Sequence, residues 1–247
     1  MSEINWINFK GLDSRDFNLL IRTKDTYKRA ERDISFISVP GRSGDVVIDN
    51  NRYKNVEIQY GVRLFATQLS NLKDNENFFY SYEEISRWLT SDGNYYKLFD
   101  SYDKMYYRKA CLINGFNASQ PHHSVADFDL KFNCKPFRYR FDGDDIIEVT
   151  NQNTVIENTE IYESLPYIKI WGSGDIYLHI GGRQYNFFSV SDYVECDSES
   201  MNVYKSMISK NAYYQGTSFP TLQAGENNIS WNGNVTKIQI KPRWRTI

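Results

Sequence analysis

Short segments in which apolar and polar residues alternate run through most of this 247-residue sequence, and they constrain the fold more than any other feature. The clearest segment spans residues 127–134 and carries four apolar side chains at every second position: Phe128, Leu130, Phe132 and Cys134. Because successive side chains of a β-strand point to opposite faces, this period of two predicts a half-buried strand.

The same alternation recurs along the chain, and each run is bounded by Gly, Asn, Asp or Pro. Aromatic residues make up 16% of the chain, with 19 Tyr and 15 Phe, and such residues favour pleated surfaces and protein interfaces. Many short strands separated by turns predict an all-β, mainly antiparallel fold built from sandwiches. Further runs comprise Val56, Ile58, Tyr60, Val62 and Leu64, then Ile168 with Ile170, and Ile238 with Ile240.

One segment follows a helical period instead. Residues 81–84 read Ser-Tyr-Glu-Glu, which is a capping box, and Ile85, Trp88 and Leu89 follow at helical spacing before the breaker at 91–93. We therefore predict one amphipathic helix, beginning near Ser81, that packs on the sheet of the first half.

A change in local composition predicts the domain boundary. Residues 136–139 are followed by the acidic turn 142–145 and by the polar stretch 151–154. We predict a first domain over residues 1–140, an N-terminal β-sandwich with the packed helix. A second β-sandwich covers residues 141–247, and its last strand is able to return toward the first domain.

Glycine-rich segments punctuate the second half. We interpret residues 172–175, 180–183 and 224–228 as tight turns between strands, such as those expected over 176–180 and 184–188. This pattern predicts a compact antiparallel sandwich.

The composition argues against several partners. Charged residues make up 24% of the chain and the net charge is -2, so no single-sign field favours nucleic acid or an anionic bilayer. The first ten residues lack a basic, apolar secretory signal, and no stretch is apolar enough for a membrane span. We expect synthesis in a cytoplasm and no membrane insertion. Cys111, Cys134 and Cys196 are odd in number and lack metal-type spacing, so we expect buried free thiols.

The search for reactive groups predicts no catalytic residue, no cofactor site and no metal site. His122 and His123 follow Pro121 in an expected loop, while His179 lies within an alternating strand. The acidic turn 142–145 lacks the ligand order of a calcium loop and is interpreted as a solvated linker. No pair of carboxylates and no Ser or Cys nucleophile motif stands out, so we predict that the protein is not an enzyme.

Residues 40–45 read Pro-Gly-Arg-Ser-Gly-Asp but lack the ending of a phosphate-binding loop. We interpret them as a glycine-rich turn. Arg42 and Asp45 are expected to pair either within this turn or across an interface.

Several of these segments resemble the distal tail protein (Dit) family of long-tailed bacteriophages, the siphoviruses, and the resemblance spans nearly the full chain. The segment 39–45 is the more specific signal. The segments that carry the resemblance are 9–17, 39–45, 85–89, 96–103, 106–110 and 132–137 in the first half, and 166–175, 219–225 and 242–245 in the second.

This resemblance implies a structural component of the virion, assembled in the host cytoplasm and placed at the distal end of the tail, in the baseplate. The family implies a ring, usually a homohexamer, in which the first domains close the ring. The C-terminal domains are sandwiches like those of galectins and carbohydrate-binding modules. The expected partners are other copies of the chain, the major tail tube protein, the tail-associated lysin or tail fibre protein, and receptor-binding proteins used in host adsorption. DNA is expected to pass through the lumen without specific binding.

Two sets of aromatic residues are candidates for contacts. In the first domain, a core role and an interface role are both open for Trp6, Phe9, Tyr102, Tyr106 and Tyr107. In the second domain, the alternative function is a carbohydrate-binding module that recognises host cell-wall glycans, with stacking platforms offered by Trp171, Tyr177, Tyr213, Tyr214 and Trp231. Core packing or subunit contact is the other reading of this set, and the galectin-type His-Asn-Arg cluster is absent from the sequence.

Overall fold

The computed structural model describes residues 4–25, 28–67, 73–122 and 124–247. The chain divides into two compact units, which we call unit 1 (residues 1–138 with Ile247) and unit 2 (residues 139–246). The independent folding of two domains that meet near residue 140 stays a prediction.

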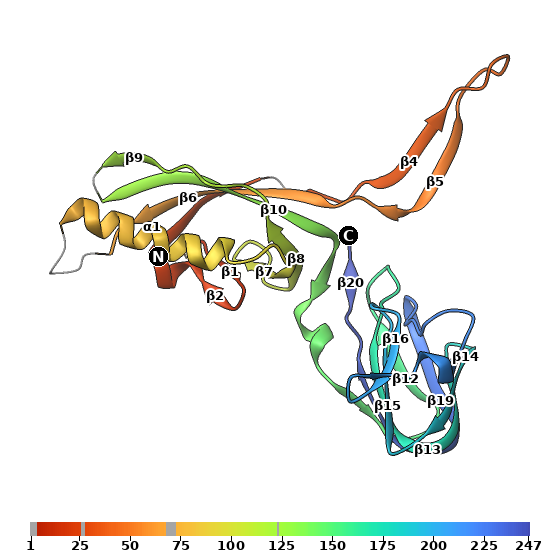
Figure 1. Cartoon of the computed structure of the whole chain (residues 1–247). Coiled ribbons are helices and arrows are strands. Elements are labelled where there is room, and N and C mark those ends of the chain that lie inside the picture. The colour runs from red at the N-terminus through yellow and green to blue at the C-terminus, as the bar shows by residue number, and fades with distance from the viewer. Residues whose placement is uncertain (1–3, 26–27, 68–72, 123) are drawn as a thin grey trace. The chain divides into compact units, whose positions relative to one another are not determined.

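Unit 1 is organised around one antiparallel sheet (Figure 1), whose strands follow the order β2-β1-β7-β8-β10-β6-β3, with β9 also paired to β10. The strands are β1 (Ile7–Phe9), β2 (Leu12–Asp13), β3 (Leu19–Lys24), β6 (Val56–Phe65), β7 (Tyr96–Asp100), β8 (Tyr106–Leu112), β9 (Ser119–His122) and β10 (Val125–Arg140). The short strand β20 (Arg245–Thr246), which also pairs with β10, falls within unit 2.

The centre of this sheet is the long pairing of β6 with β10. Phe132 lies opposite Ile58 and Leu130 lies opposite Tyr60, so the alternating residues of both strands share one face. All nine of the apolar residues predicted from these two runs are buried. The two predicted strands and their inward faces are therefore confirmed.

The helix of unit 1, α1 (Asp74–Thr90), begins seven residues before the predicted start. Glu76 accepts a hydrogen bond from the Lys73 backbone N–H at 2.8 Å, while the Ser81 hydroxyl, inside the helix, accepts from the Thr67 N–H. The prediction of a start at Ser81 was wrong because this hydroxyl satisfies a loop amide rather than the helix end. Ile85, Trp88 and Leu89 are buried in the core of unit 1, as expected. Trp88 also donates from its indole nitrogen to the Phe9 carbonyl at 2.8 Å.

A separate two-stranded sheet, β4 (Arg32–Ile37) with β5 (Val46–Tyr53), also belongs to unit 1. Figure 1 shows it extending away from the larger sheet.

Unit 2 is a second antiparallel assembly with the order β11-β19-β13-β15-β16-β17, to which β12, β14 and β18 are added by pairing with β19, β13 and β14. Its core contains Ile168 and Ile170 of β13 and Ile238 and Ile240 of β19, all completely buried. The strands are β11 (Ile147–Val149), β12 (Thr154–Asn158), β13 (Tyr167–Ile180), β14 (Arg183–Val190), β15 (Tyr193–Asp197), β16 (Asn202–Lys205), β17 (Ile208–Ser209), β18 (Tyr214–Gln215) and β19 (Gly225–Lys241).

Two of the three turns predicted in unit 2 are wrong. Residues 172–175 lie inside β13, where the pairing with β19 is irregular, and residues 225–228 lie inside β19, where they pair in regular register with β12. In both places the chain continues as a strand rather than reversing. At Gly172 the β13 backbone approaches β19 so closely that an added Cβ would lie 2.2 Å from the Asn234 carbonyl oxygen. The turn at 180–183 is confirmed, with positive φ at Gly181 and Gly182.

The acidic turn 142–145 is also different from the prediction of a solvated linker. Residues Phe141–Asp144 form a 3-10 helix in which Gly143 is buried and accepts a hydrogen bond from the Arg243 N–H at 2.7 Å. Asp142 pairs with Arg140 at 2.6 Å. The turn is therefore an ordered part of unit 2. Among the helices of the described residues, none has the length and apolarity needed to cross a bilayer.

The close approach at Gly172 leads to a stability prediction. Gly172→Ala forces the β13 backbone away from Asn234, and we expect the free energy of unfolding to fall by about 1–3 kcal/mol, measured by urea denaturation. Gly93→Ala is the matched control, because its added Cβ meets open space and its φ is not left-handed. Its effect should stay within about 0.5 kcal/mol. Equal effects of the two substitutions would contradict the close packing described for Gly172.

Candidate functional site

The most exposed element of unit 1 is the hairpin of residues 32–53, which we call the arm. Its two strands pair with Phe36 opposite Val47 and Ile37 opposite Val46. The turn between them is the predicted glycine-rich segment, in which Gly41 and Gly44 have φ values of 81° and 84°. Such left-handed conformations suit glycine, which has no Cβ to clash with the backbone.

The expected pairing of Arg42 with Asp45 within this turn is wrong. Asp45 instead accepts a hydrogen bond from the Ser38 hydroxyl at 2.6 Å, and Arg42 donates its backbone N–H to the Val39 carbonyl. Both side chains are exposed. Among the described residues, the Asp45 carboxylate has no cationic partner.

Both faces of the arm carry apolar side chains that are open to solvent. Residues directly opposite one another in a hairpin share a face, so Phe36 and Val47 lie on one face, with 66% and 58% of their surface exposed. Ile37 and Ile48 belong to the other face and are also exposed. A two-stranded hairpin is marginally stable by itself in water. The arm therefore presents the kind of surface that a partner protein covers.

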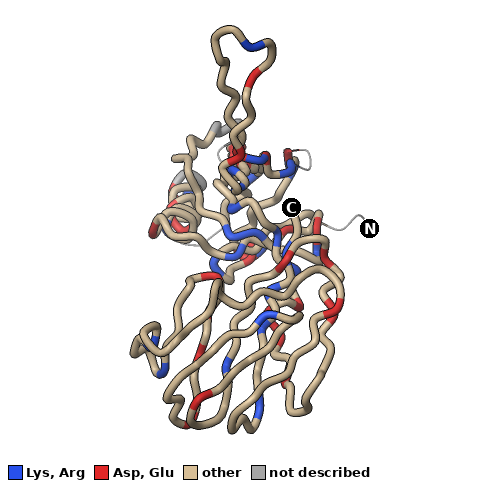
Figure 2. The backbone as a smooth tube through the Cα atoms, turned by 90° about the vertical axis from the view of Figure 1, so that its right-hand side faces the viewer, with Lys and Arg blue, Asp and Glu red and all other residues tan. Residues whose placement is uncertain are grey.

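Ion pairs between the strands support the lower part of the arm. Arg32 pairs with Asp49 at 2.6 Å, and Arg52 pairs with Asp33 at the same distance. Lys and Arg residues are sparse along the arm and gather in unit 1 near its base (Figure 2). Two of the three carboxylates of the arm are thus neutralised locally, and that of Asp45 is not.

A second feature of unit 1 is a cavity of about 100 Å³, which we call the basic pocket. Five cationic and two acidic residues line it, so its walls carry an excess of positive charge. The lining residues are Lys24, Lys28, Arg29, Ile58, Tyr60, Leu98, Asp100, Asp103, Tyr106, Tyr107, Arg108 and Arg138.

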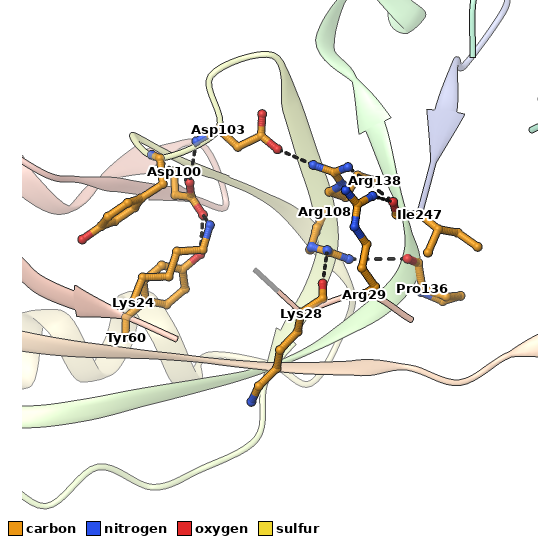
Figure 3. Close-up of polar contacts among 11 residues, drawn as sticks. Lys24, Lys28, Arg29, Tyr60, Asp100, Asp103, Arg108, Pro136, Arg138 and Ile247 are labelled. Atoms are coloured by element: carbon orange, nitrogen blue, oxygen red, sulfur yellow. Dashed lines mark hydrogen bonds and ion pairs between the residues drawn. The ribbon is translucent and has the colours of Figure 1, made fainter. Parts of the chain in front are cut away.

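One end of the basic pocket is internally neutralised (Figure 3, left). The Asp100 carboxylate accepts from the Lys24 ammonium and from the Tyr60 hydroxyl, both at 2.6 Å. Its other oxygen accepts two backbone N–H groups, from Tyr102 and Asp103, at 3.0 Å. Burial and the nearby Asp100 charge raise the pKa of Tyr60 well above its usual value. Tyr60 therefore stays protonated and donates a hydrogen bond to the Asp100 carboxylate.

The other end of the pocket holds three guanidinium groups (Figure 3), and we call Arg29, Arg108 and Arg138 the guanidinium cluster. Arg138 pairs with Asp103 at 2.7 Å and donates to the main-chain oxygen of Ile247 at 3.3 Å. Arg29 donates to the same Ile247 oxygen.

Arg108 has only neutral acceptors within the described residues. It donates to the main-chain carbonyls of Lys28 at 3.2 Å and Pro136 at 3.4 Å. Desolvation lowers its pKa from the ordinary value. The Nε atom of Arg138 is buried and has no hydrogen-bond partner in the part of the chain that is described. Arg138 thus binds the Asp103 carboxylate, Arg29 and Arg138 both bind the oxygen of Ile247, the last residue printed, and Arg108 is the one of the three whose described hydrogen bonds go to neutral carbonyls alone.

The candidate contact aromatics of the first half divide into two groups. Phe9 and Tyr107 are buried, with 1% and 3% exposure, and their core role is confirmed. Trp6, Tyr102 and Tyr106 are half-buried. Each of these three rings lies beneath a cation, from Arg15, Lys24 and Arg138 respectively.

The candidate glycan platforms do not share one environment. Trp231 is buried in unit 2, and Tyr214 stacks on Phe219 with ring centroids 4.9 Å apart. Trp171 is half-buried with the Lys169 ammonium 4.5 Å from its ring centroid, and Tyr177 is half-buried as well. Of these five residues, Tyr213 alone is exposed, at 47%.

The histidines are placed partly as expected. His122 ends strand β9 and lies opposite Val125, so its assignment to a loop was wrong, because the chain pairs up to that residue before it reverses. His123 lies outside the described residues. His179 lies in β13, and its Nε2 atom is 3.5 Å from the Asn232 amide. Among the residues that the structure describes, no group of three His, Cys, Asp or Glu side chains could hold a metal ion.

Cys134 and Cys196 are buried free thiols, as predicted, while Cys111 is half-buried. Burial raises the pKa of Cys134 to about 12 and raises that of Cys196 as well.

Sequence reasoning missed the basic pocket entirely. Its cations come from segments around residues 24–29, 108 and 138, which only the folded sheet brings together. The dipeptides Lys28-Arg29 and Arg108-Lys109 are the available hints, and neither differs from an ordinary charged surface.

No known protein-family profile matches the sequence, and no curated protein matches it. Among solved structures, the chain is similar to the SPP1 Dit (gp 19.1) protein, described as a paradigm of the hub adsorption apparatus in phages that infect Gram-positive hosts. The similarity covers 99% of this chain and 100% of that chain, with a TM-score of 0.70 and 12% sequence identity. At this identity the likeness shows the fold. The predicted fold class and the resemblance to Dit are confirmed at that level.

The buried network at Asp100 leads to a prediction. Tyr60→Phe removes a buried donor to the carboxylate, and we expect the free energy of unfolding to fall by about 1–2 kcal/mol in urea denaturation. Tyr95→Phe is the control, because the Tyr95 hydroxyl also makes hydrogen bonds but its side chain is exposed. An equal fall in the free energy of unfolding for Tyr95→Phe and Tyr60→Phe would show that burial does not strengthen the contribution of the Tyr60 hydrogen bond.

A second prediction concerns the thiols. Since a raised pKa leaves little thiolate at pH 8, Cys134 and Cys196 should react slowly with a disulfide reagent such as DTNB in the native protein. We expect fast modification of Cys111 alone, loss of this fast phase in Cys111→Ser, and reaction of all three thiols after denaturation. Fast native labelling of two or more thiols would count against the burial described.

Proposed function

We propose that this chain is a structural hub subunit of a phage tail tip. In this role a ring of copies, six by the family resemblance, lies at the distal end of the tail. The ring joins the tail tube to the tail-associated lysin or fibre protein and leaves a channel for DNA. The observation that carries the proposal is the fold, which is similar over the whole chain to that of a phage hub protein.

The arm supports association between copies. Its two apolar faces are exposed in the described part of the chain, and burial of apolar surface is a main driving force of protein association. When each copy offers an arm and receives another, the contact is heterologous. Such contacts generate a closed ring when the rotation between copies closes. The half-buried aromatics Trp6, Tyr102 and Tyr106 are further candidates for contacts in the same assembly.

The proposed role requires no catalytic group. Receptor-binding proteins at the periphery of the ring would complete the adsorption apparatus. Glycan binding by unit 2, the alternative that the sequence left open, has no comparable observation in its favour. Four of its five candidate aromatics are buried or half-buried, and Lys169 lies over the ring of Trp171.

The test is the solution mass of the purified protein, by sedimentation and light scattering, with negative-stain images of the same fraction. We expect closed oligomers with a central hole. The double variant Phe36→Asp/Val47→Asp places charges on one exposed face of the arm and should weaken association at least about tenfold, equivalent to about 1.4 kcal/mol per interface.

Ile161→Asp is the matched control for the arm variant, because Ile161 is 78% exposed and belongs to unit 2. The control should assemble like the unmodified chain, and circular dichroism should show all three proteins folded. A chain that stays monomeric at every concentration, alone and with tail tube protein, would refute the proposed ring.

A further inference from the structure

We propose that Asn232, which precedes Gly233 in strand β19, is a site of spontaneous deamidation in the folded protein. Its side-chain amide is converted there to the carboxylate of an aspartyl or isoaspartyl residue. The site goes beyond the proposed function and does not depend on it. The chain contains two Asn-Gly dipeptides, Asn114-Gly115 and Asn232-Gly233, and the fold gives them different surroundings.

The reaction uses groups of the chain and one water molecule. The backbone nitrogen of the glycine attacks the Cγ atom of the asparagine, and this new bond closes a succinimide ring. The bond from Cγ to the side-chain nitrogen breaks, and ammonia leaves with the proton of the backbone nitrogen. Water then opens the ring at either carbonyl carbon, which gives aspartate or isoaspartate. Glycine favours the first step because it has no Cβ to obstruct its nitrogen.

The fold requires a glycine directly after Asn232. Gly233 has a φ of 107°, which residues with side chains rarely adopt, and an added Cβ would lie 2.4 Å from the Asp175 carbonyl oxygen. The register between β13 and β19 shifts at this point, so that residues 174–176 of β13 stand against Gly233 alone. The same irregularity that joins the two strands therefore fixes a reactive dipeptide in the sequence.

The side chain of Asn232 is held only weakly. Asn232 is exposed, and in the described part of the chain its side-chain nitrogen makes one contact, with His179 Nε2 at 3.5 Å. This distance is at the outer limit of a hydrogen bond, so the contact opposes rotation of the amide very little. The Cγ atom is thus able to move toward the nitrogen of Gly233.

Asn114 is the opposite case. Its Oδ1 atom accepts a hydrogen bond from the Lys131 backbone N–H at 2.8 Å, and its Nδ2 atom donates to the Asp129 carbonyl at 3.0 Å. Both ends of the amide are therefore bonded to β10, and attack by the Gly115 nitrogen requires both bonds to break. We expect these two bonds to slow the reaction at Asn114 at least about tenfold relative to Asn232.

The products change the surface of unit 2. Each adds one negative charge at an exposed position of β19, next to His179. The isoaspartyl product also inserts a methylene group into the backbone of the strand. Purified protein is therefore expected to become a mixture of charge forms on storage.

The experiment is incubation of the full chain at mildly alkaline pH in water labelled with heavy oxygen, followed by peptide mass spectrometry at intervals. The peptide that contains Asn232 should lose ammonia and take up one solvent oxygen at least about tenfold faster than the peptide that contains Asn114. Incubation in urea removes the hydrogen bonds of Asn114, and the two rates should then agree within about threefold.

Asn232→Gln is the matched variant, because it keeps an amide but has to close a larger and less favourable ring. It should remove the acidic form that anion exchange separates from stored protein, and circular dichroism should show it folded. A folded chain in which Asn232 reacts no faster than Asn114 would overturn the inference. A difference that persists in urea would assign the effect to local sequence rather than to the fold, and an acidic form that persists in Asn232→Gln would place the modification elsewhere.

Discussion

The pairing of β6 with β10 is the interaction on which the rest of unit 1 depends. The register runs without a break from Val125 opposite Phe65 to Cys134 opposite Val56 and buries one continuous apolar face. β6 begins three residues after the arm ends, so the same ladder anchors the base of the arm. It also carries Tyr60 into the basic pocket from one strand and Arg138 from the other. Both candidate surfaces are therefore positioned by one rigid element.

This arrangement divides the apolar residues of unit 1 between two uses. Those of β6 and β10 alternate with polar residues and are buried in the core, whereas Phe36, Val47 and Ile48 belong to consecutive apolar runs on both faces of the arm and remain exposed. Among the residues that the structure describes, no third layer covers the arm, and a hairpin of two strands gains little stability by itself. In the proposed assembly this apolar surface would be buried, and its burial would then contribute to stability.

Much of the fold could be predicted from the sequence because alternation reports burial directly, as for Phe128 to Cys134. The errors arose where one local signal has two physical uses. Ser81 begins a capping-box sequence but binds a loop amide, and Gly172 permits a close approach between strands rather than a turn. The basic pocket could not be predicted, because Arg29, Arg108 and Arg138 are separated by long stretches of chain and each resembles an ordinary surface cation alone.

The arm and the basic pocket differ in the kind of contact that they can make with a partner. Apolar contacts along the arm are non-directional, so they contribute affinity but do not fix the position of the bound arm along its partner. A charge pair in a narrow cavity depends steeply on position and rejects like charges, so it supplies register. In a head-to-tail contact register decides the rotation between neighbours, and this rotation decides between a closed ring and an open filament.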